Sequence, residues 1–114
     1  MNEIAKKNAL KLLGLMRVAS LAVSGEEACE KAVRTQEAVL VVVSSDASQL
    51  TRKKFHDKCK FYEVEVLDAD LTMEELGKSL GQSPRSSVAI LSKDLAENFK
   101  QRLRQTGEEY SGSY

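Results

Sequence analysis

Apolar residues recur along the chain with two spacings, one typical of helices and one typical of strands. Between residues 4 and 19 they return every three or four positions, which predicts an amphipathic helix. The apolar run 38–43 shows no alternation, which is typical of a strand covered on both faces. Within residues 62–67, apolar side chains alternate with acidic ones, as expected for a half-exposed strand nearer the edge of a sheet. We therefore expect residues 39–43 to form the buried, central strand.

The whole pattern predicts five helices and four strands that alternate. The helices are expected at residues 4–19, 25–35, 47–60, 72–80 and 94–104, and the strands at residues 21–23, 38–44, 62–67 and 87–91. Such alternation indicates an α/β fold, a three-layer α/β/α sandwich with a small, mostly four-stranded mixed sheet. We expect residues 1–104 to form a single domain. Residues 105–114 lack core residues and are predicted to be a disordered tail.

Short polar motifs predict where the helices begin and end. Residues 24–27 (Ser-Gly-Glu-Glu) and 72–75 have the spacing of a capping box, in which a hydroxyl and a carboxylate accept from backbone amides of the first turn. Residues 44–46 (Ser-Ser-Asp) form a further cluster of helix-capping residues. Gly81 is predicted to terminate a helix. The helix that starts near Gly25 would present a partial positive charge beside the sheet, where a phosphate can bind.

The charges balance over the chain but are unevenly distributed. The chain has 17 Lys and Arg and 17 Asp and Glu, and this net charge of zero argues against a protein that coats nucleic acid without sequence preference. Residues 52–60 carry five basic side chains and one acidic one, whereas residues 63–75 carry six acidic side chains and no basic one. Runs of this kind are most often solvated faces of helices and loops. The alternative for residues 52–54 is a local basic patch that extends a nucleic-acid footprint.

Signatures of catalysis, cofactors and metal binding are missing from the sequence. It contains no G-x-G-x-x-G, no P-loop and no G-x-S-x-G motif. His56 and Cys59 could share a helix face, but a metal ion needs more ligands than these two. They could also form a catalytic Cys–His pair, although a buried Cys59 thiol and an exposed His56 are the stronger interpretation. Cys29 is likewise expected to be buried. Lys11 and Arg17 interrupt the N-terminal apolar stretch, which argues against a signal peptide. We expect a soluble, cytoplasmic, non-enzymatic protein with no cofactor and no metal.

Three polar loops form the candidate binding surface. In alternating α/β folds the strand-to-helix loops gather at one end of the sheet, and residues 24–27 and 44–48 are such loops. The polar segment 82–87 precedes the last strand and is expected to fold over the same surface. Together the loops offer amides, hydroxyls, an arginine and carboxylates with almost no aromatic side chains. This combination suits an RNA backbone and base edges better than stacked single strands.

Seven short stretches resemble the kink-turn RNA-binding family of large-subunit ribosomal proteins, and especially its small bacterial YlxQ-type branch. They occur in the same order, at Leu12–Leu15, Ser24–Glu27, Lys31–Arg34, Ser45–Ser48, Asp57–Cys59, Leu76–Gly81 and Ser87–Ile90. The resemblance implies an α/β/α sandwich that grips the bend of a kink-turn in structured RNA. It implies ribosomal RNA and the ribosome as partners, with neither DNA nor a membrane involved, and we expect a monomer.

The resemblance also implies which residues hold the RNA, at the start of the second helix, one turn further on, and in the loop before the last strand. By position these residues are Gly25, Glu26, Glu27, Lys31, Gln82, Ser83, Arg85, Ser86 and Ser87. Archaeal relatives have Asn at the position of Glu27. A carboxylate only accepts hydrogen bonds, so Glu27 would contact base amino groups.

Basic residues that bacterial relatives usually carry are absent from two stretches, 18–21 and 36–39. Their loss predicts a weaker RNA affinity or a different partner. One alternative function is therefore a protein-interaction module in translation or RNA metabolism that no longer binds kink-turns. A second is a stand-alone relative of the RNA-recognition domain that precedes some RNA methyltransferases. A gel shift with a kink-turn RNA and a matched duplex separates RNA binding from the first alternative.

Overall fold

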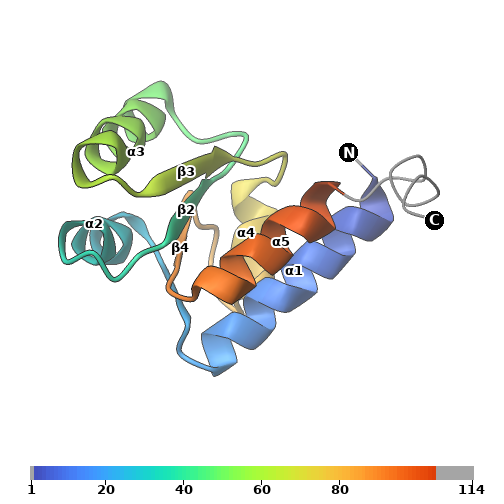
Figure 1. Ribbon diagram of the computed structural model, residues 1–114. Coiled ribbons are helices and arrows are strands. Elements are labelled where there is room, and N and C mark those ends of the chain that lie inside the picture. Colours follow the sequence, from blue (N-terminus) through green and yellow to red (C-terminus); the bar gives the residue numbers. More distant parts are fainter. Residues whose placement is uncertain (1, 105–114) are drawn as a thin grey trace.

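The computed structural model describes residues 2–104, in which five helices and four strands alternate as predicted (Figure 1). The helices are α1 (Glu3–Val18), α2 (Glu26–Arg34), α3 (Gln49–Tyr62), α4 (Met73–Ser79) and α5 (Lys93–Arg104). The strands are β1 (Ala22–Ser24), β2 (Leu40–Val43), β3 (Glu65–Asp68) and β4 (Ser87–Ile90). The predicted disordered tail, residues 105–114, lies outside the described residues.

The strands form one mixed sheet in the order β1-β4-β2-β3. Strand β2 runs parallel to β3 and antiparallel to β4, and β1 pairs antiparallel with β4. All four residues of β2 are buried, which confirms the prediction of a central strand covered on both faces. Strand β3 lies at an edge, as its alternation predicted, although Tyr62 belongs to α3 and not to this strand.

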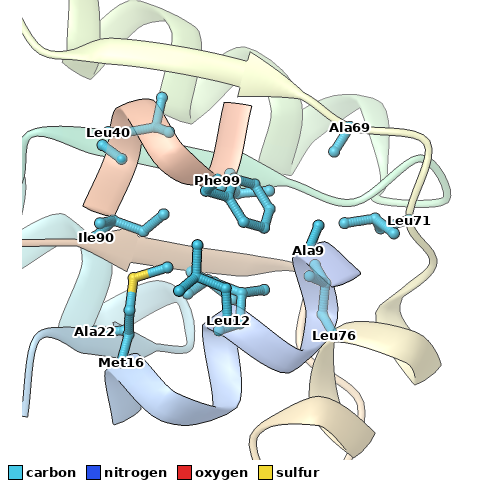
Figure 2. Close-up of a cluster of buried hydrophobic side chains, with 14 of the residues drawn as sticks. Ala9, Leu12, Met16, Ala22, Leu40, Ala69, Leu71, Leu76, Ile90 and Phe99 are labelled. Carbon is cyan, nitrogen blue, oxygen red and sulfur yellow. The ribbon is translucent and has the colours of Figure 1, made fainter. Parts of the chain in front are cut away.

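Helices cover both faces of the sheet and produce the predicted three layers. Figure 1 shows α2 and α3 on one side, with α1, α4 and α5 on the other. Because successive residues of a strand point to opposite faces, Leu40 and Val42 pack toward α1 and α5, whereas Val41 and Val43 pack toward α2 and α3. Figure 2 shows the first of these clusters, in which α5 contributes Phe99. The sheet is therefore held between two separate hydrophobic cores.

Helix α2 begins without the predicted capping box. Ser24 is the last residue of β1, and the N-cap is Gly25, at a φ of 97° that favours glycine. No side chain caps this helix. The Ser24 hydroxyl accepts instead from Arg85 Nε at 3.2 Å. The prediction was wrong because Ser24 is drawn into the sheet opposite Val88, a partner distant in sequence.

The other predicted helix starts and ends depend only on residues close in sequence, and most of them are confirmed. The capping box of α4 is confirmed, with Thr72 and Glu75 each accepting from the backbone amide of the other. Gly81 follows α4 at a φ of 67°, as a helix-terminating glycine should. Helix α3 starts later than predicted, with Ser48 as its cap. The Asp46 carboxylate accepts from the first amide of α4 at 2.9 Å instead.

Candidate nucleic-acid interface

The three predicted loops meet at one end of the sheet. The Gly25 amide donates to the Ser87 carbonyl at 3.1 Å, which joins the turn before α2 to the start of β4. The Ser44 amide donates to the Ser86 carbonyl at 2.9 Å, which brings the loop after β2 alongside. This convergence results from the antiparallel pairing of β4, whose N-terminal end lies between the C-terminal ends of β1 and β2.

An open pocket of about 520 Å³ lies between the turn before α2 and the loop before β4. It is lined by Ser24, Gly25, Glu26, Glu27, Ala28, Pro84, Arg85 and Ser86. Five of the nine predicted RNA-binding residues therefore surround one depression. Among the other four, Gln82 and Ser83 belong to the same loop and both contact Arg85, while Lys31 lies further along α2.

Arg85 holds the loop before β4 in shape. Its guanidinium donates to Ser83 Oγ at 2.7 Å, to Gln82 Oε1 at 3.1 Å and to Ser24 Oγ at 3.2 Å, and also to the carbonyls of Ser83 and Pro84. Within residues 2–104, no carboxylate pairs with it. The loop is thus tied to β1 by a half-buried cation, in a pocket that Glu26 and Glu27 also line.

The two acidic residues at the start of α2 have different surroundings. Glu26 accepts from Thr51 Oγ1 at 3.2 Å and pairs with Lys54 at 3.0 Å, which fastens it to α3. Glu27 is exposed, and in the described part of the chain it has no ion-pair partner. Lys31 is also exposed and unpaired there, although it lies four residues after Glu27. Glu27 and Lys31 are therefore available to a ligand, whereas Glu26 is engaged within the protein.

One predicted contact residue does not reach the surface. Ser87 is fully buried within β4. Only its backbone takes part in the site, by accepting from Gly25. We therefore leave the Ser87 side chain out of the interface; the sequence placed it at the end of a polar loop, where burial by the neighbouring strands was not visible.

Three of the five basic side chains in the run 52–60 form ion pairs with nearby carboxylates. Arg52 pairs with Asp68 at 2.7 Å, and Lys53 pairs with Asp57 at the same distance. Lys54 lies between two carboxylates of α2, whose hydrogen bonds raise the pKa of its ammonium. These ion pairs favour the interpretation of residues 52–54 as a helix face rather than an extended RNA footprint.

The Cys–His pair considered from the sequence is not assembled. Cys59 is fully buried, and burial raises the pKa of its thiol to about 11. The His56 ring lies instead at the surface, with Nε2 at 2.8 Å from Asp68 Oδ2. Burial likewise raises the pKa of Cys29 to about 11, so both cysteines are neutral thiols at physiological pH.

Within residues 2–104, no group of three or more His, Cys, Asp or Glu side chains is arranged to hold a metal ion. In the same range, no helix has both the length and the apolar character needed to span a membrane.

Two features that support the loop were missed from the sequence. Gly77 of α4 packs against the loop so closely that a Cβ there would overlap the Ser83 carbonyl. The Arg85 amide also donates to the Met73 carbonyl at 3.0 Å, so both ends of α4 contact the loop. A glycine inside a helical pattern was the one available signal, because glycine is costly at such a position.

Known proteins share both the sequence pattern and this architecture. The model of the ribosomal protein L7Ae/L30e/S12e/Gadd45 family matches residues 7–100. A Bacillus subtilis (strain 168) protein named RNA-binding protein YlxQ is 39% identical over 88 residues, which cover 77% of this chain and 87% of the relative. An Enterococcus faecium protein of the same name is 33% identical over 103 residues, which cover 90% of this chain and 98% of the relative.

Two solved structures resemble the fold. A protein of unknown function from Bacillus halodurans C matches with a TM-score of 0.78 at 31% identity, covering 85% of this chain and 97% of the other. The Giardia lamblia 15.5kD RNA binding protein matches with a TM-score of 0.69 at 20% identity, covering 90% of this chain and 88% of the other, a likeness that concerns the fold alone. From the family match and the two bacterial relatives, the chain belongs to the ribosomal protein L7Ae/L30e/S12e/Gadd45 family.

Proposed function

We propose that this protein binds structured RNA, with a kink-turn as its preferred form, and that it acts without catalysis. Membership of a ribosomal-protein family supports this function, as do the two bacterial relatives that are named RNA-binding proteins. The observation that carries the proposal is the juxtaposition of the α2 N-terminus with the Arg85 loop at one end of the sheet.

The uncapped start of α2 supplies the main donors in this proposal. Because Gly25 has no side chain and no other side chain caps the helix, the amides of the first turn are left for a ligand. Such amides, at the positive end of the helix dipole, suit phosphate oxygens or base carbonyls. The missing capping box therefore favours RNA binding, since a Ser24 cap would have used one of these donors.

The charged side chains of the site have distinct roles in the proposal. Lys31 lies one turn into α2 and contacts a phosphate adjacent to the first turn. Glu27 is exposed and accepts from base amino groups, which gives preference for one RNA structure over another. Arg85 adds positive potential but uses most of its donors within its own loop. With so few cations, we expect about two to four phosphate contacts in the salt dependence of binding.

The family also supports a setting for this activity. We propose that the protein acts as a monomer in the cytoplasm on ribosomal or other structured RNA, with the ribosome as a candidate partner. The alternative functions are a protein-interaction module without kink-turn binding and a relative of the recognition domain of RNA methyltransferases. The first alternative predicts no preference for a kink-turn over a duplex.

The test is a salt titration of binding to a kink-turn RNA and to a matched duplex. We expect tighter binding of the kink-turn, and Lys31→Ala should lower the slope of log K against log salt by about one unit for both RNAs. Glu27→Gln should reduce the preference for the kink-turn while stability stays unchanged, because Glu27 does not cap α2.

Lys93→Ala, an exposed lysine at the start of α5, is the matched control and should change the slope less than Lys31→Ala. Equal binding of both RNAs would contradict kink-turn recognition. Binding of neither RNA would contradict the RNA-binding proposal and favour the protein-interaction module.

A further inference from the structure

A groove of about 730 Å³ with a largely apolar lining runs between α1 and α4, away from the RNA site. The two helices are in contact along the same face of the sheet (Figure 1). The groove shares no lining residue with the pocket between α2 and the loop before β4. It is therefore a separate surface, and a role for it does not depend on RNA binding.

The groove exposes aliphatic side chains that no described residue covers. Leu15 and Val18, in the last turns of α1, are 64% and 84% exposed, and Leu10 lies partly buried beside them. Gly14 forms part of the lining, and a Cβ there would lie 2.9 Å from the Ser79 carbonyl oxygen of α4. Exposed aliphatic groups gathered around a hollow are a feature of protein-interaction surfaces.

The rim of the groove is basic and only partly neutralised. Lys6 pairs with Glu75 at 3.4 Å and with Glu3 at 3.8 Å. Lys7, Lys11 and Lys78 have no ion-pair partner within residues 2–104. A complementary occupant would combine aliphatic side chains for the floor with carboxylates for these three ammonium groups.

We propose that the α1–α4 groove docks an acidic amphipathic helix of a partner protein. Helix α1 has 16 residues and a length of about 24 Å, which matches about four turns of a bound helix. Such a helix places leucines at every third or fourth position in the groove and keeps its glutamates beside the rim.

The same observations disfavour other occupants. A symmetric dimer through this groove would bring the unpaired Lys7, Lys11 and Lys78 of both copies into one interface, where their like charges repel. RNA bases stack best on aromatic side chains, and the lining of the groove contains none. A flat bilayer would not fill the hollow around Gly14.

The first experiment titrates the isotope-labelled full chain with a synthetic peptide of about 16 residues that has leucines at helical spacing and glutamates elsewhere. We expect backbone amide shifts confined to α1 and α4, and an affinity that falls with added salt. A peptide with the same leucines, but with lysines in place of the glutamates, should not bind.

Two variants identify the groups responsible. Lys7→Glu combined with Lys11→Glu should weaken binding of the acidic peptide at least tenfold, and Val18→Ser should weaken it several-fold. The matched controls are Lys60→Glu combined with Lys93→Glu, which reverses two exposed lysines elsewhere, and Leu50→Ser, which removes an exposed leucine of α3. Both controls should bind the peptide with less than a threefold change.

Four results would overturn the proposal. The first is the absence of backbone amide shifts on α1 and α4 at millimolar acidic peptide, and the second is equal binding of the lysine peptide. The third is α1 amide shifts with anionic phosphatidylglycerol vesicles but not with the peptide. The fourth is a dimer formed through this face, detected by analytical ultracentrifugation. The third result would assign the face to a membrane surface, and the fourth to a second copy of the chain.

Discussion

At the scale of single residues, Arg85 shows how structural and binding roles can coincide. Its guanidinium makes five hydrogen bonds to four residues, from Ser24 in β1 to Ser83 and Gln82 in its own loop. A planar guanidinium can donate in several fixed directions, whereas an ammonium is a compact point charge with three rotatable donors. The loop therefore depends on the geometry of the side chain as much as on its charge.

This geometry predicts the effect of Arg85→Lys, which keeps the positive charge. Several of the five hydrogen bonds would be lost, and we expect stability to fall by about 1–2 kcal/mol in urea denaturation. RNA affinity should fall with it, because the loop no longer lies fixed against β1. Arg104→Lys, at an exposed position of α5, is the control and should leave both quantities unchanged. Unaltered amide shifts across residues 82–86 in Arg85→Lys would refute the organising role.

Gly77→Ala tests the support that α4 gives to the same loop. Alanine favours a helix by about 1 kcal/mol over glycine, but here its Cβ would overlap the Ser83 carbonyl. Since backbone atoms have little room to shift, we expect a net loss of about 1–3 kcal/mol of stability in thermal unfolding, together with weaker RNA binding. Gly14→Ala, which meets only one oxygen at 2.9 Å, should cost less stability and should spare RNA binding. A stabilised Gly77→Ala would disprove the close contact.

At the scale of elements, the two motifs that looked alike in the sequence predict different mutational effects. Thr72→Ala removes a true capping box, and we expect the free energy of unfolding to fall by about 1 kcal/mol in chemical denaturation.

The hydrogen bond from the Thr72 amide lowers the pKa of Glu75 in the folded state. The stability that this carboxylate contributes is therefore present above its unfolded pKa of 4.5 and is lost as the pH falls below that value. Glu75→Gln should therefore flatten the acidic limb of the stability curve, and an unchanged limb would contradict the box.

The same contrast explains how much of the structure was predictable. Helices, strands and the Thr72 box depend on spacing within a few residues, and the buried β2 on its unbroken apolar run. The Ser24 box failed because Arg85, 61 residues away, and the pairing with β4 decide the role of that serine. Within the candidate site, the sequence predicted that the three loops meet at one end of the sheet. The ion pair between Glu26 and Lys54 and the burial of Ser87 were not predictable, because both depend on tertiary contacts.

At the scale of the whole molecule, ion pairs act both within a layer and between layers. Lys54 links α3 to α2 in the same layer, whereas Lys100 of α5 pairs with Glu65 of β3 in the sheet at 2.8 Å. Such partly exposed pairs contribute little stability individually, so the two hydrophobic cores carry most of it. The core that lies under α2 and α3 also contains both cysteines.

The buried thiols predict how global stability changes at alkaline pH. The folded state raises the pKa of Cys29 and of Cys59 from 9.0 to about 11, mainly through burial. As the pH rises, the two thiols ionise in the unfolded chain before they ionise in the folded one. The free energy of unfolding is therefore unaffected by the thiols below pH 9 and falls as the pH rises from 9 toward 11. Urea denaturation from neutral pH up to that range under reducing conditions should show the decline. The double variant Cys29→Ala and Cys59→Ala should show a shallower one, and identical slopes would contradict the assignment.

The position of β4 in the sheet also has a consequence for how the chain folds. Strand β4 lies between β1 and β2 but comes after both in the chain, separated from β1 by α2, β2, α3, β3 and α4. Until it is synthesised, the facing edges of β1 and β2 remain unpaired, and such edges recruit other chains. A nascent chain that ends before Ser87 should therefore need a chaperone, and the folding rate should be limited by closure of the long loop between β1 and β4.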